Sequence, residues 1–354
     1  MTTQNSAPGK LRARLHDGHW AYRQLAVEVY VPADTQKFNP HVKDGASPSA
    51  LAGKTIRMTG FRCEVDIECY GQLDGVAAQI NITNVPPDIM NAVAGYYGQD
   101  GLVFQRVNGN DFPEVRLYDV TQYGQKPLAR KATNGKSSED GQGKLIYRGY
   151  LTNAIANMGS MPDPFLSIQS NSLLPIQLLK AEVISYRGSV PTITVIKQIA
   201  DAIGYTLEDS GVNTVMVNPY LTGNYIDQLD KMARYGGDFS YLLEGKTLAV
   251  WPNGGYRKRS EESYAKINKG NGMIYSPSFN RSGVTVKTIF RSDLHFGDKI
   301  EIESESLPNA TGLYAIRAIS HHLSSELPEG LWESHIAATF MVDKNTPVAI
   351  ARHS

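Results

Sequence analysis

The sequence pattern of the last third of the chain predicts one antiparallel β module, and this feature constrains the fold more than any other. Between residues 270 and 340, four segments alternate apolar and polar side chains at the period of a strand, and short polar turns separate them. These segments are residues 284–290, 299–306, 313–321 and 331–340. Strands at such short spacing are typical of a sandwich or a barrel, so the sequence predicts an antiparallel β domain here.

Two predicted strands carry acidic side chains on one face. In residues 299–306, Ile300 and Ile302 alternate with glutamates, and residues 61–69 show the same alternation of apolar and charged positions. Because successive side chains of a strand point to opposite faces, each segment places three carboxylates on one face. These candidate residues are Glu64, Asp66, Glu68, Glu301, Glu303 and Glu305. Each set is either a solvated strand face or a functional surface.

The first third of the chain is also rich in predicted strands. Their β-branched and aromatic alternation places them at residues 20–31, 54–70, 76–83, 114–120, 144–151 and 165–170. Within residues 54–70 the apolar side chains change from even to odd positions at Thr59 and Gly60. This change of phase predicts a bulge or a sharp bend, as small barrels need at their corners.

One short helix and two long loops are expected between these strands. Prolines followed by Asp88 favour a helix over residues 89–97, and Gly98 is placed to end it. Residues 99–112 and 125–143 are polar and rich in glycine, which is typical of exposed loops.

The middle of the chain changes to helical spacing. Apolar residues recur at this spacing from Thr192 until Gly204, which predicts a helix that ends at the glycine. A second helix is predicted over residues 225–235, and a hairpin of residues 239–243 and 247–251 follows. The second helix contains two acid-before-base pairs, Asp227 with Lys231 and Asp230 with Arg234. These elements predict a compact α+β insert.

The segment that leaves the insert is polar and charged. Residues 253–269 include the run Arg257, Lys258 and Arg259, followed by two glutamates. Such a segment is typical of a linker, so we expect it to connect the insert to the C-terminal β module.

Charge and cysteine content limit the classes of function. The sequence contains 35 Lys and Arg residues and 35 Asp and Glu residues, so no net field draws the protein to nucleic acid or to an anionic membrane. We find no signal peptide and no stretch apolar enough to span a bilayer, and therefore expect the chain to fold in the cytoplasm. Cys63 and Cys69 lie on one predicted strand, roughly 20 Å apart, which is too far for a disulfide. Both are expected to be small buried side chains.

The sequence contains no strong signal for catalysis, a metal or a cofactor. Adjacent His321 and His322 face opposite sides of a strand and cannot bind one ion together. The triplet Gly135, Lys136 and Ser137 is similar to the end of a phosphate-binding loop, but the first glycine of that motif is missing. Neither a Gly-x-Ser-x-Gly turn nor a His-Glu-x-x-His helix is present. We therefore predict a protein that is not an enzyme and holds no metal or cofactor.

Two other classes of function remain open from the residues. One is a cell-wall hydrolase, whose paired carboxylates could not be recognised from a single sequence. The other is a carbohydrate-binding β module that uses Tyr96, Tyr97, Trp251 and Tyr256 as an aromatic face. Tyrosines more often complete β cores or line subunit interfaces.

A family resemblance emerges from three stretches in a fixed order. They are residues 79–89 with 145–151 and 163–168, then residues 225–239 with the hairpin, then residues 272–277, 283–286, 296–300, 312–316 and 322–325. Together they resemble the central hub proteins of contractile phage-tail baseplates, including the hub of Mu-like phages and the related spike-base domain of type VI secretion.

The resemblance implies a homotrimeric ring in which two similar β domains per subunit occupy six near-equivalent positions. Such a ring joins a sixfold tail tube to a threefold central spike. Its implied partners are tail tube or tube-initiator proteins and the spike, with wedge or tape-measure proteins as further candidates. The ring would lie in the virion tail baseplate, after assembly in the host bacterial cytoplasm, and would surround the channel for genome ejection. The six carboxylates above would then line that channel and repel passing DNA phosphates.

The resulting prediction is a mainly β fold with an α+β insert. We expect two antiparallel β-barrel-like tube domains linked by a small α+β domain. Their boundaries are predicted at residues 1–175 for the first tube domain, 176–262 for the insert and 263–354 for the second tube domain.

Overall fold

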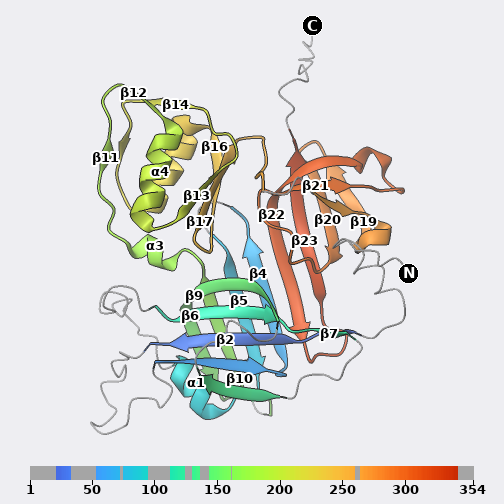
Figure 1. Cartoon of the computed structure of the whole chain (residues 1–354). Helices are drawn as coiled ribbons and strands as arrows, with labels where there is room; N and C mark the ends of the chain where they lie inside the picture. The colour runs from blue at the N-terminus through green and yellow to red at the C-terminus, as the bar shows by residue number, and fades with distance from the viewer. Residues whose placement is uncertain are drawn as a thin grey trace, which may run out of the picture. The chain divides into compact units, whose positions relative to one another are not determined.

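A computed structural model describes residues 21–32, 53–71, 75–94, 112–123, 130–135, 143–160, 162–259 and 264–341 (Figure 1). The N-terminal arm and most of the two predicted loops lie outside these residues. The described part is mainly β with an α+β insert, as predicted. Contacts within the chain divide it into two compact units. Unit 1 comprises Met1–Glu68, Val76–Leu178 and His321–Glu333, and unit 2 comprises Cys69–Gly75, Leu179–Ser320 and Ser334–Ser354.

Unit 1 is built on one antiparallel sheet. Its strands lie in the order β4 (Cys63–Cys69), β5 (Ala77–Thr83), β10 (Phe165–Asn171), β9 (Lys144–Asn157), β6 (Glu114–Asp119), β2 (Leu25–Val31), β3 (Lys54–Thr59) and β8 (Lys131–Gly135). A small ribbon pairs β1 (Ala21–Tyr22) with β7 (Gln122–Tyr123). Two helices accompany the sheet, α1 (Pro87–Ala94) and α3 (Leu174–Leu178).

The predicted change of phase between Thr59 and Phe61 is a true break in the chain direction. Gly60 has φ 72°, a left-handed conformation that glycine adopts without steric cost. The break separates β3, which pairs with β2 and β8, from β4, which pairs with β5. One continuous stretch of sequence therefore supplies strands to two distant places in the sheet.

The C-terminal part of unit 2 is the β module that the sequence predicts. Its strand path runs β19 (Met273–Asn280), β20 (Gly283–Ile289), β23 (Trp332–Phe340) and β22 (Gly312–Ser325). β21 (Lys299–Ile302) pairs with β22, and β18 (Ala265–Ile267) runs parallel to β21. Two short 3₁₀ turns accompany these strands, at Lys269–Asn271 and Pro308–Ala310.

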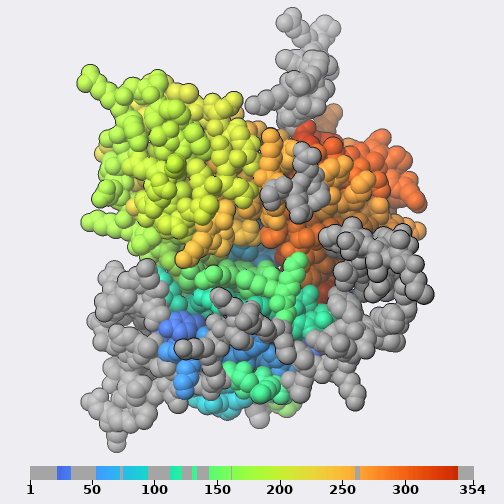
Figure 2. All heavy atoms as spheres, viewed as in Figure 1, coloured from blue at the N-terminus to red at the C-terminus, as the bar shows by residue number. Residues whose placement is uncertain are grey.

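The α+β insert of unit 2 contains two helices and a three-stranded sheet. Its sheet has the order β13 (Thr206–Asp209), β17 (Thr247–Pro252) and β16 (Phe239–Glu244), with β13 parallel to β17. Two ribbons pair β11 (Ile184–Ser185) with β15 (Tyr220–Leu221) and β12 (Ser189–Pro191) with β14 (Val215–Val217). The helices are α4 (Thr192–Ile203) and α5 (Tyr225–Met232). In Figure 2 the insert is the compact yellow-green block.

Both insert helices begin where the sequence predicts. α4 buries Val195, Ile196 and Ile199 and ends at Gly204, whose φ is 71°. α5 ends earlier than predicted, because a single π-turn over Ala233–Gly237 follows Met232. The predicted pair of Asp230 and Arg234 is present at 2.9 Å.

The other predicted pair of α5, Asp227 with Lys231, is replaced by contacts of each residue with other partners. Asp227 and Asn224 form a capping box at the start of the helix, where each side chain accepts a backbone N–H of the other residue. Lys231 instead donates to the carbonyl oxygen of Thr222 at 2.6 Å. Backbone N–H groups at the start of a helix have no partner within the helix. One of them binds the carboxylate of Asp227, which the sequence spacing pairs with Lys231.

Two further predictions of local structure are wrong. Lys131–Gly135, expected within an exposed loop, forms β8 because the edge of β3 accepts its backbone. The predicted strand 299–306 ends at Ile302. There the backbone N–H of Ser304 donates to the Thr311 hydroxyl, and the Ser304 hydroxyl accepts from the N–H of Leu307. These side-chain contacts turn the chain away from the strand.

Cys63 and Cys69 confirm their prediction. Both are buried and neither forms a disulfide. Burial raises the pKa of the Cys63 thiol, and the nearby Glu64 carboxylate adds to the increase. Among the described residues, none forms a helix that is long and apolar enough to cross a membrane.

Candidate functional site

The first acidic set lies on the outer face of β4, as predicted. Along this strand Cys63, Val65 and Ile67 are buried, while the side chains between them are exposed or half-exposed. The outer set is Glu64, Asp66 and Glu68. The structure thus confirms that these three carboxylates share one face of a strand.

On one side of β4, the strands β5 and β10 continue this face without basic side chains. In register with the acids of β4, β5 presents Asn81 beside Glu64 and Gln79 beside Asp66. β10 then places Gln169 beside Gln79. The outer surface over β4, β5 and β10 therefore combines carboxylates with neutral amides.

One arginine and one histidine lie at the margin of this surface. Arg62 lies 3.5 Å from Glu64, and both side chains are about half exposed. His322, near the end of β22, places Nδ1 2.6 Å from Oδ1 of Asp66. Exposed pairs of this kind contribute little to stability, about 0–1 kcal/mol, and the Arg62 guanidinium reduces the net charge of the face.

The second acidic set differs from the first. Glu301 lies on β21, whereas Glu303 and Glu305 follow the end of that strand. Lys266 of β18 lies 2.8 Å from Glu301 and 3.9 Å from Glu303. The hydrogen bond and charge of Glu301 raise the pKa of Lys266. These acids are consequently part of a paired surface, and they do not form one strand face.

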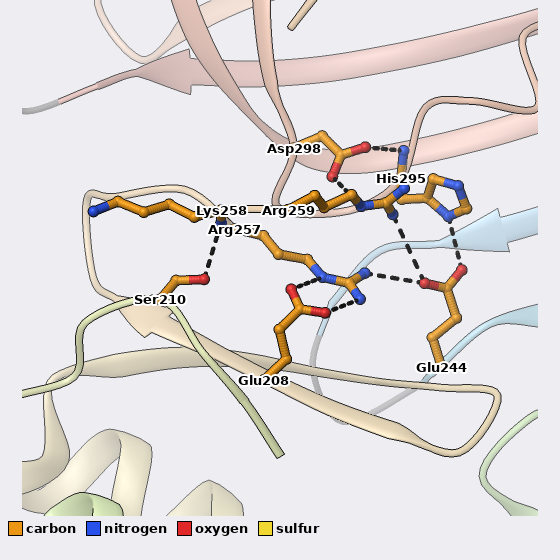
Figure 3. Close-up of polar contacts among 8 residues, drawn as sticks. All are labelled: Glu208, Ser210, Glu244, Arg257, Lys258, Arg259, His295 and Asp298. Atoms are coloured by element: carbon orange, nitrogen blue, oxygen red, sulfur yellow. Dashed lines mark hydrogen bonds and ion pairs between the residues drawn. The ribbon is translucent and has the colours of Figure 1, made fainter. Parts of the chain in front are cut away.

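A buried charge cluster lies in unit 2 that the sequence did not predict (Figure 3). Arg257 lies in the polar segment predicted to be a linker, but only 7% of its side chain is exposed. Its guanidinium forms two hydrogen bonds to Glu208, at 2.7 and 2.8 Å, and a third to Glu244, at 3.1 Å. The polar composition of the segment did not predict this burial, because the two carboxylates that hold Arg257 inside are distant in sequence.

Further contacts extend the cluster into the loop between β20 and β21 (Figure 3). Nδ1 of His295 lies 2.7 Å from Glu244, and Arg259 lies 3.2 Å from Asp298. The backbone N–H of Arg257 donates to the carbonyl of Gly297 at 2.8 Å. The backbone N–H of Lys258 donates to the Ser210 hydroxyl at 2.9 Å.

The electrostatics of the cluster favour the ionised form of Glu244. Burial opposes ionisation of Glu244, but the hydrogen bond and charge of His295, together with Arg257, outweigh burial and lower the pKa of Glu244 to about 2. Burial raises the pKa of Asp298, against the opposing charges of Arg259 and His295. The lowered pKa of Glu244 thus results from contacts with segments far apart in the sequence.

An apolar contact lies next to the cluster. The rings of Trp251 and Phe296 have centroids 5.9 Å apart, and Trp251 is completely buried. A buried indole cannot stack on a sugar in solution, so Trp251 does not belong to an exposed carbohydrate-binding face. Tyr96 and Tyr97 of that alternative lie outside the described residues.

The remaining motifs have structural surroundings. His321 is buried and His322 is partly exposed, as expected for neighbours on one strand. No group of three or more His, Cys, Asp or Glu side chains suited to a metal occurs in the part of the chain that the structure describes. Gly135 of the predicted phosphate-loop-like triplet is the last residue of β8, and Lys136 and Ser137 lie outside the described residues.

Comparisons with known proteins give one family and several similar folds. Residues 118–328 match a family described as baseplate hub gp41. No curated protein matches the chain. A 43 kDa tail protein of prophage MuSo2 from Shewanella oneidensis has a similar fold, with TM-score 0.50 and 7% identity over 90% of this chain and 97% of that protein.

Two other solved structures are also similar. The tail protein from Neisseria meningitidis MC58 has TM-score 0.49 and 10% identity, over 89% of this chain and 96% of that one. An E. coli component of the type VI secretion system has TM-score 0.48 and 9% identity, over 82% of this chain and 77% of that one.

Proposed function

The chain belongs to the baseplate hub gp41 family, and from this premise we propose that three copies form the ring that joins a sixfold tail tube to a threefold central spike. Its role is structural, in the baseplate of a phage tail. In the proposed ring each subunit contributes two tube domains, residues 1–175 and 263–354, and the insert 176–262 links them. Three such subunits supply six positions and so reconcile the two symmetries.

The outer face of β4 is the observation that supports a channel function. Glu64, Asp66 and Glu68 share this face, and the strands beside it present amides. A surface with carboxylates and no lysine or arginine among its strand positions repels phosphates and offers them no ionic partner. We assign this face to the ring lumen, with Glu301, Glu303 and Glu305 as the second acidic set.

Exposed apolar side chains support burial in an assembly. Val217, Tyr220 and Tyr275 of unit 2 are 67%, 70% and 85% exposed. Tyr275 also has φ 61° within an irregular part of β19, a strand at the end of the described sheet path. Exposed large apolar side chains and open strand edges make a free monomer prone to aggregate, and contacts between subunits would cover both.

The proposed partners follow from this position. The ring contacts tail tube or tube-initiator proteins on one side and the central spike on the other, with wedge or tape-measure proteins as peripheral contacts. DNA passes through it without specific binding during genome ejection. The protein acts through its contacts with other subunits and partner proteins, without catalysis. It is assembled in the host cytoplasm and lies in the virion tail baseplate.

Native mass spectrometry followed by cryo-electron microscopy tests the proposal. We expect a species of three chains, and a threefold map in which the outer face of β4 points toward the axis. A stable monomer at micromolar concentration would contradict the trimer. A ring in which Glu64, Asp66 and Glu68 point outward would contradict the channel assignment and leave the trimer intact.

A further inference from the structure

We propose that the charge cluster around Arg257 is a clasp that holds the α+β insert on the C-terminal β module, and that the insert separates from the module without unfolding when the clasp is broken. This inference concerns unit 2 alone and does not depend on ring formation. The cluster is defined here as Glu208, Glu244, Arg257, Arg259, His295 and Asp298 (Figure 3).

The residues of the clasp come from four separate segments. Glu208 lies on β13 and Glu244 at the end of β16, so both belong to the sheet of the insert. His295 and Asp298 lie between β20 and β21, in the β module. Arg257 and Arg259 lie on the segment that leaves the insert after β17. Every ion pair of the clasp that involves Arg257 or His295 therefore joins segments that sequence separates.

The geometry makes Arg257 the centre of the clasp. Its guanidinium holds Glu208 through two nearly equal hydrogen bonds and holds Glu244 through a third. Glu244 in turn contacts His295 of the module through its other carboxylate oxygen. Glu244 is thus the carboxylate shared by the exit segment and the module. A guanidinium suits this position because its planar donors match two carboxylates and it does not lose its proton.

The loop 293–298 is fixed in place by its own bonds. The backbone N–H of His295 donates to Asp298 at 2.9 Å, and the N–H of Gly297 donates to Ile316 of β22 at 3.0 Å. This loop therefore presents His295 and Asp298 to the insert as a preformed surface. The module therefore supplies a preformed half of the clasp, and the carboxylates Glu208 and Glu244 of the insert supply the other half.

The position of the clasp allows it to open. Arg257 is buried, but Glu208 and Glu244 keep 30% and 35% of their side chains exposed. The cluster thus lies at the rim of the apolar contact between Trp251 and Phe296, where water can replace each lost partner. By contrast, both the insert and the module have buried cores of their own. Loss of the clasp should free one body from the other while each keeps its fold.

Pulsed electron paramagnetic resonance on the full chain tests this inference. Spin labels are attached at Lys197→Cys on α4 and Thr285→Cys on β20, which are both exposed positions. The native Cys63 and Cys69 are buried and so are poor targets for the label. The test variants are Arg257→Gln and Glu244→Gln. The control is Arg234→Gln, which breaks the ion pair between Asp230 of α5 and the π-turn that follows this helix.

We expect one narrow distance distribution for the parent and for Arg234→Gln. Arg257→Gln should lose the narrow peak and give a broad distribution, while its far-ultraviolet circular dichroism stays that of the parent. Glu244→Gln should broaden the peak less, because Glu208 still holds Arg257. An unchanged narrow peak in both test variants would overturn the clasp. Loss of circular dichroism in both would overturn separation without unfolding.

Discussion

At Gly297 the backbone approaches an aromatic ring so closely that only a hydrogen fits. Its φ is 85°, and a Cβ built there would lie 2.6 Å from Cζ2 of Trp251. The carbonyl oxygen of Gly297 itself accepts a hydrogen bond from the backbone N–H of Arg257. This glycine therefore supports both the apolar contact and the clasp. A residue with no side chain is required here by conformation and by space together.

Gly297→Ala should therefore lower the free energy of unfolding by about 2–4 kcal/mol, from left-handed strain and overpacking combined. Gly245→Ala is the matched control, because Gly245 has φ 61° but open space around it. That control should cost about 1 kcal/mol, from strain alone. Urea denaturation measures both values. An equal loss of unfolding free energy in Gly297→Ala and Gly245→Ala would show that the ring of Trp251 leaves room for a methyl group at residue 297.

Ionisation of Glu244 should give unit 2 a distinct acid dependence. The folded pKa of about 2 lies below the usual value of 4.5, so the ionised form is favoured in the folded state. Its contribution to stability is complete above the unfolded pKa and is lost as the pH falls through the folded pKa. Urea unfolding between pH 6 and about 2 should show a smaller loss for Glu244→Gln than for the parent. Parallel curves for the two proteins would contradict this prediction.

Single residues were predictable from the sequence where a local pattern decides their surroundings. Cys63 and Cys69 follow the alternation of one strand, and that alternation places them in the core. Arg257 was not predictable, because its partners Glu208 and Glu244 lie on two strands that the tertiary fold brings together. A charged run after a hairpin looks like a linker until its distant carboxylates are known.

At the scale of elements, alternation and turn chemistry predicted most strands, and the errors have specific causes. β21 stops early because Ser304 and Thr311 offer the backbone other partners. β8 forms from a polar sequence with little strand propensity because β3 presents an edge to it. Helix α5 ends early because Tyr235 and Gly236 leave helical backbone angles.

The start of α5 provides a test at this scale. Asn224→Ala removes the side chain that accepts the N–H of Asp227 and should cost about 1 kcal/mol of unfolding free energy. Asn213→Ala, at an exposed position of the insert outside any helix or strand, should change it by less than about 0.5 kcal/mol. Thermal unfolding followed by circular dichroism compares the two. A similar effect of both changes would mean that the cap does not stabilise the helix.

At the scale of the whole molecule, the sequence predicted the fold class but not how the chain is shared between units. Residues 321–333 lie in unit 1, although the strands β22 and β23 that contain them also build unit 2. The sequence analysis predicts domains made of continuous segments. The periodicity of a long strand does not show that its two ends belong to different units. The three-part division at residues 175 and 262 remains a prediction.

Neutralising the acidic face of β4 should change how the assembled protein treats DNA. In the variant Glu64→Gln, Asp66→Asn and Glu68→Gln, duplex DNA should be retained to higher salt concentration, because phosphate repulsion is removed. The control changes three other exposed carboxylates, Glu182→Gln, Asp201→Asn and Glu329→Gln. Elution of short duplexes from immobilised protein over a salt gradient measures the difference. Equal retention by the two variants would count against a lumen at β4.

The placement of residues 321–333 in unit 1 also affects how the protein is made. β4 has β22 as a neighbour in the sheet, and Leu25 and Gln24 receive hydrogen-bond partners from Ser325 and Glu326. A ribosome releases these partners hundreds of residues after the strands that need them. β2 and β4 must therefore wait, with one sheet margin uncovered, until residues 321–333 have left the ribosome, since the contact of Leu25 with Ser325 spans 300 positions of the sequence.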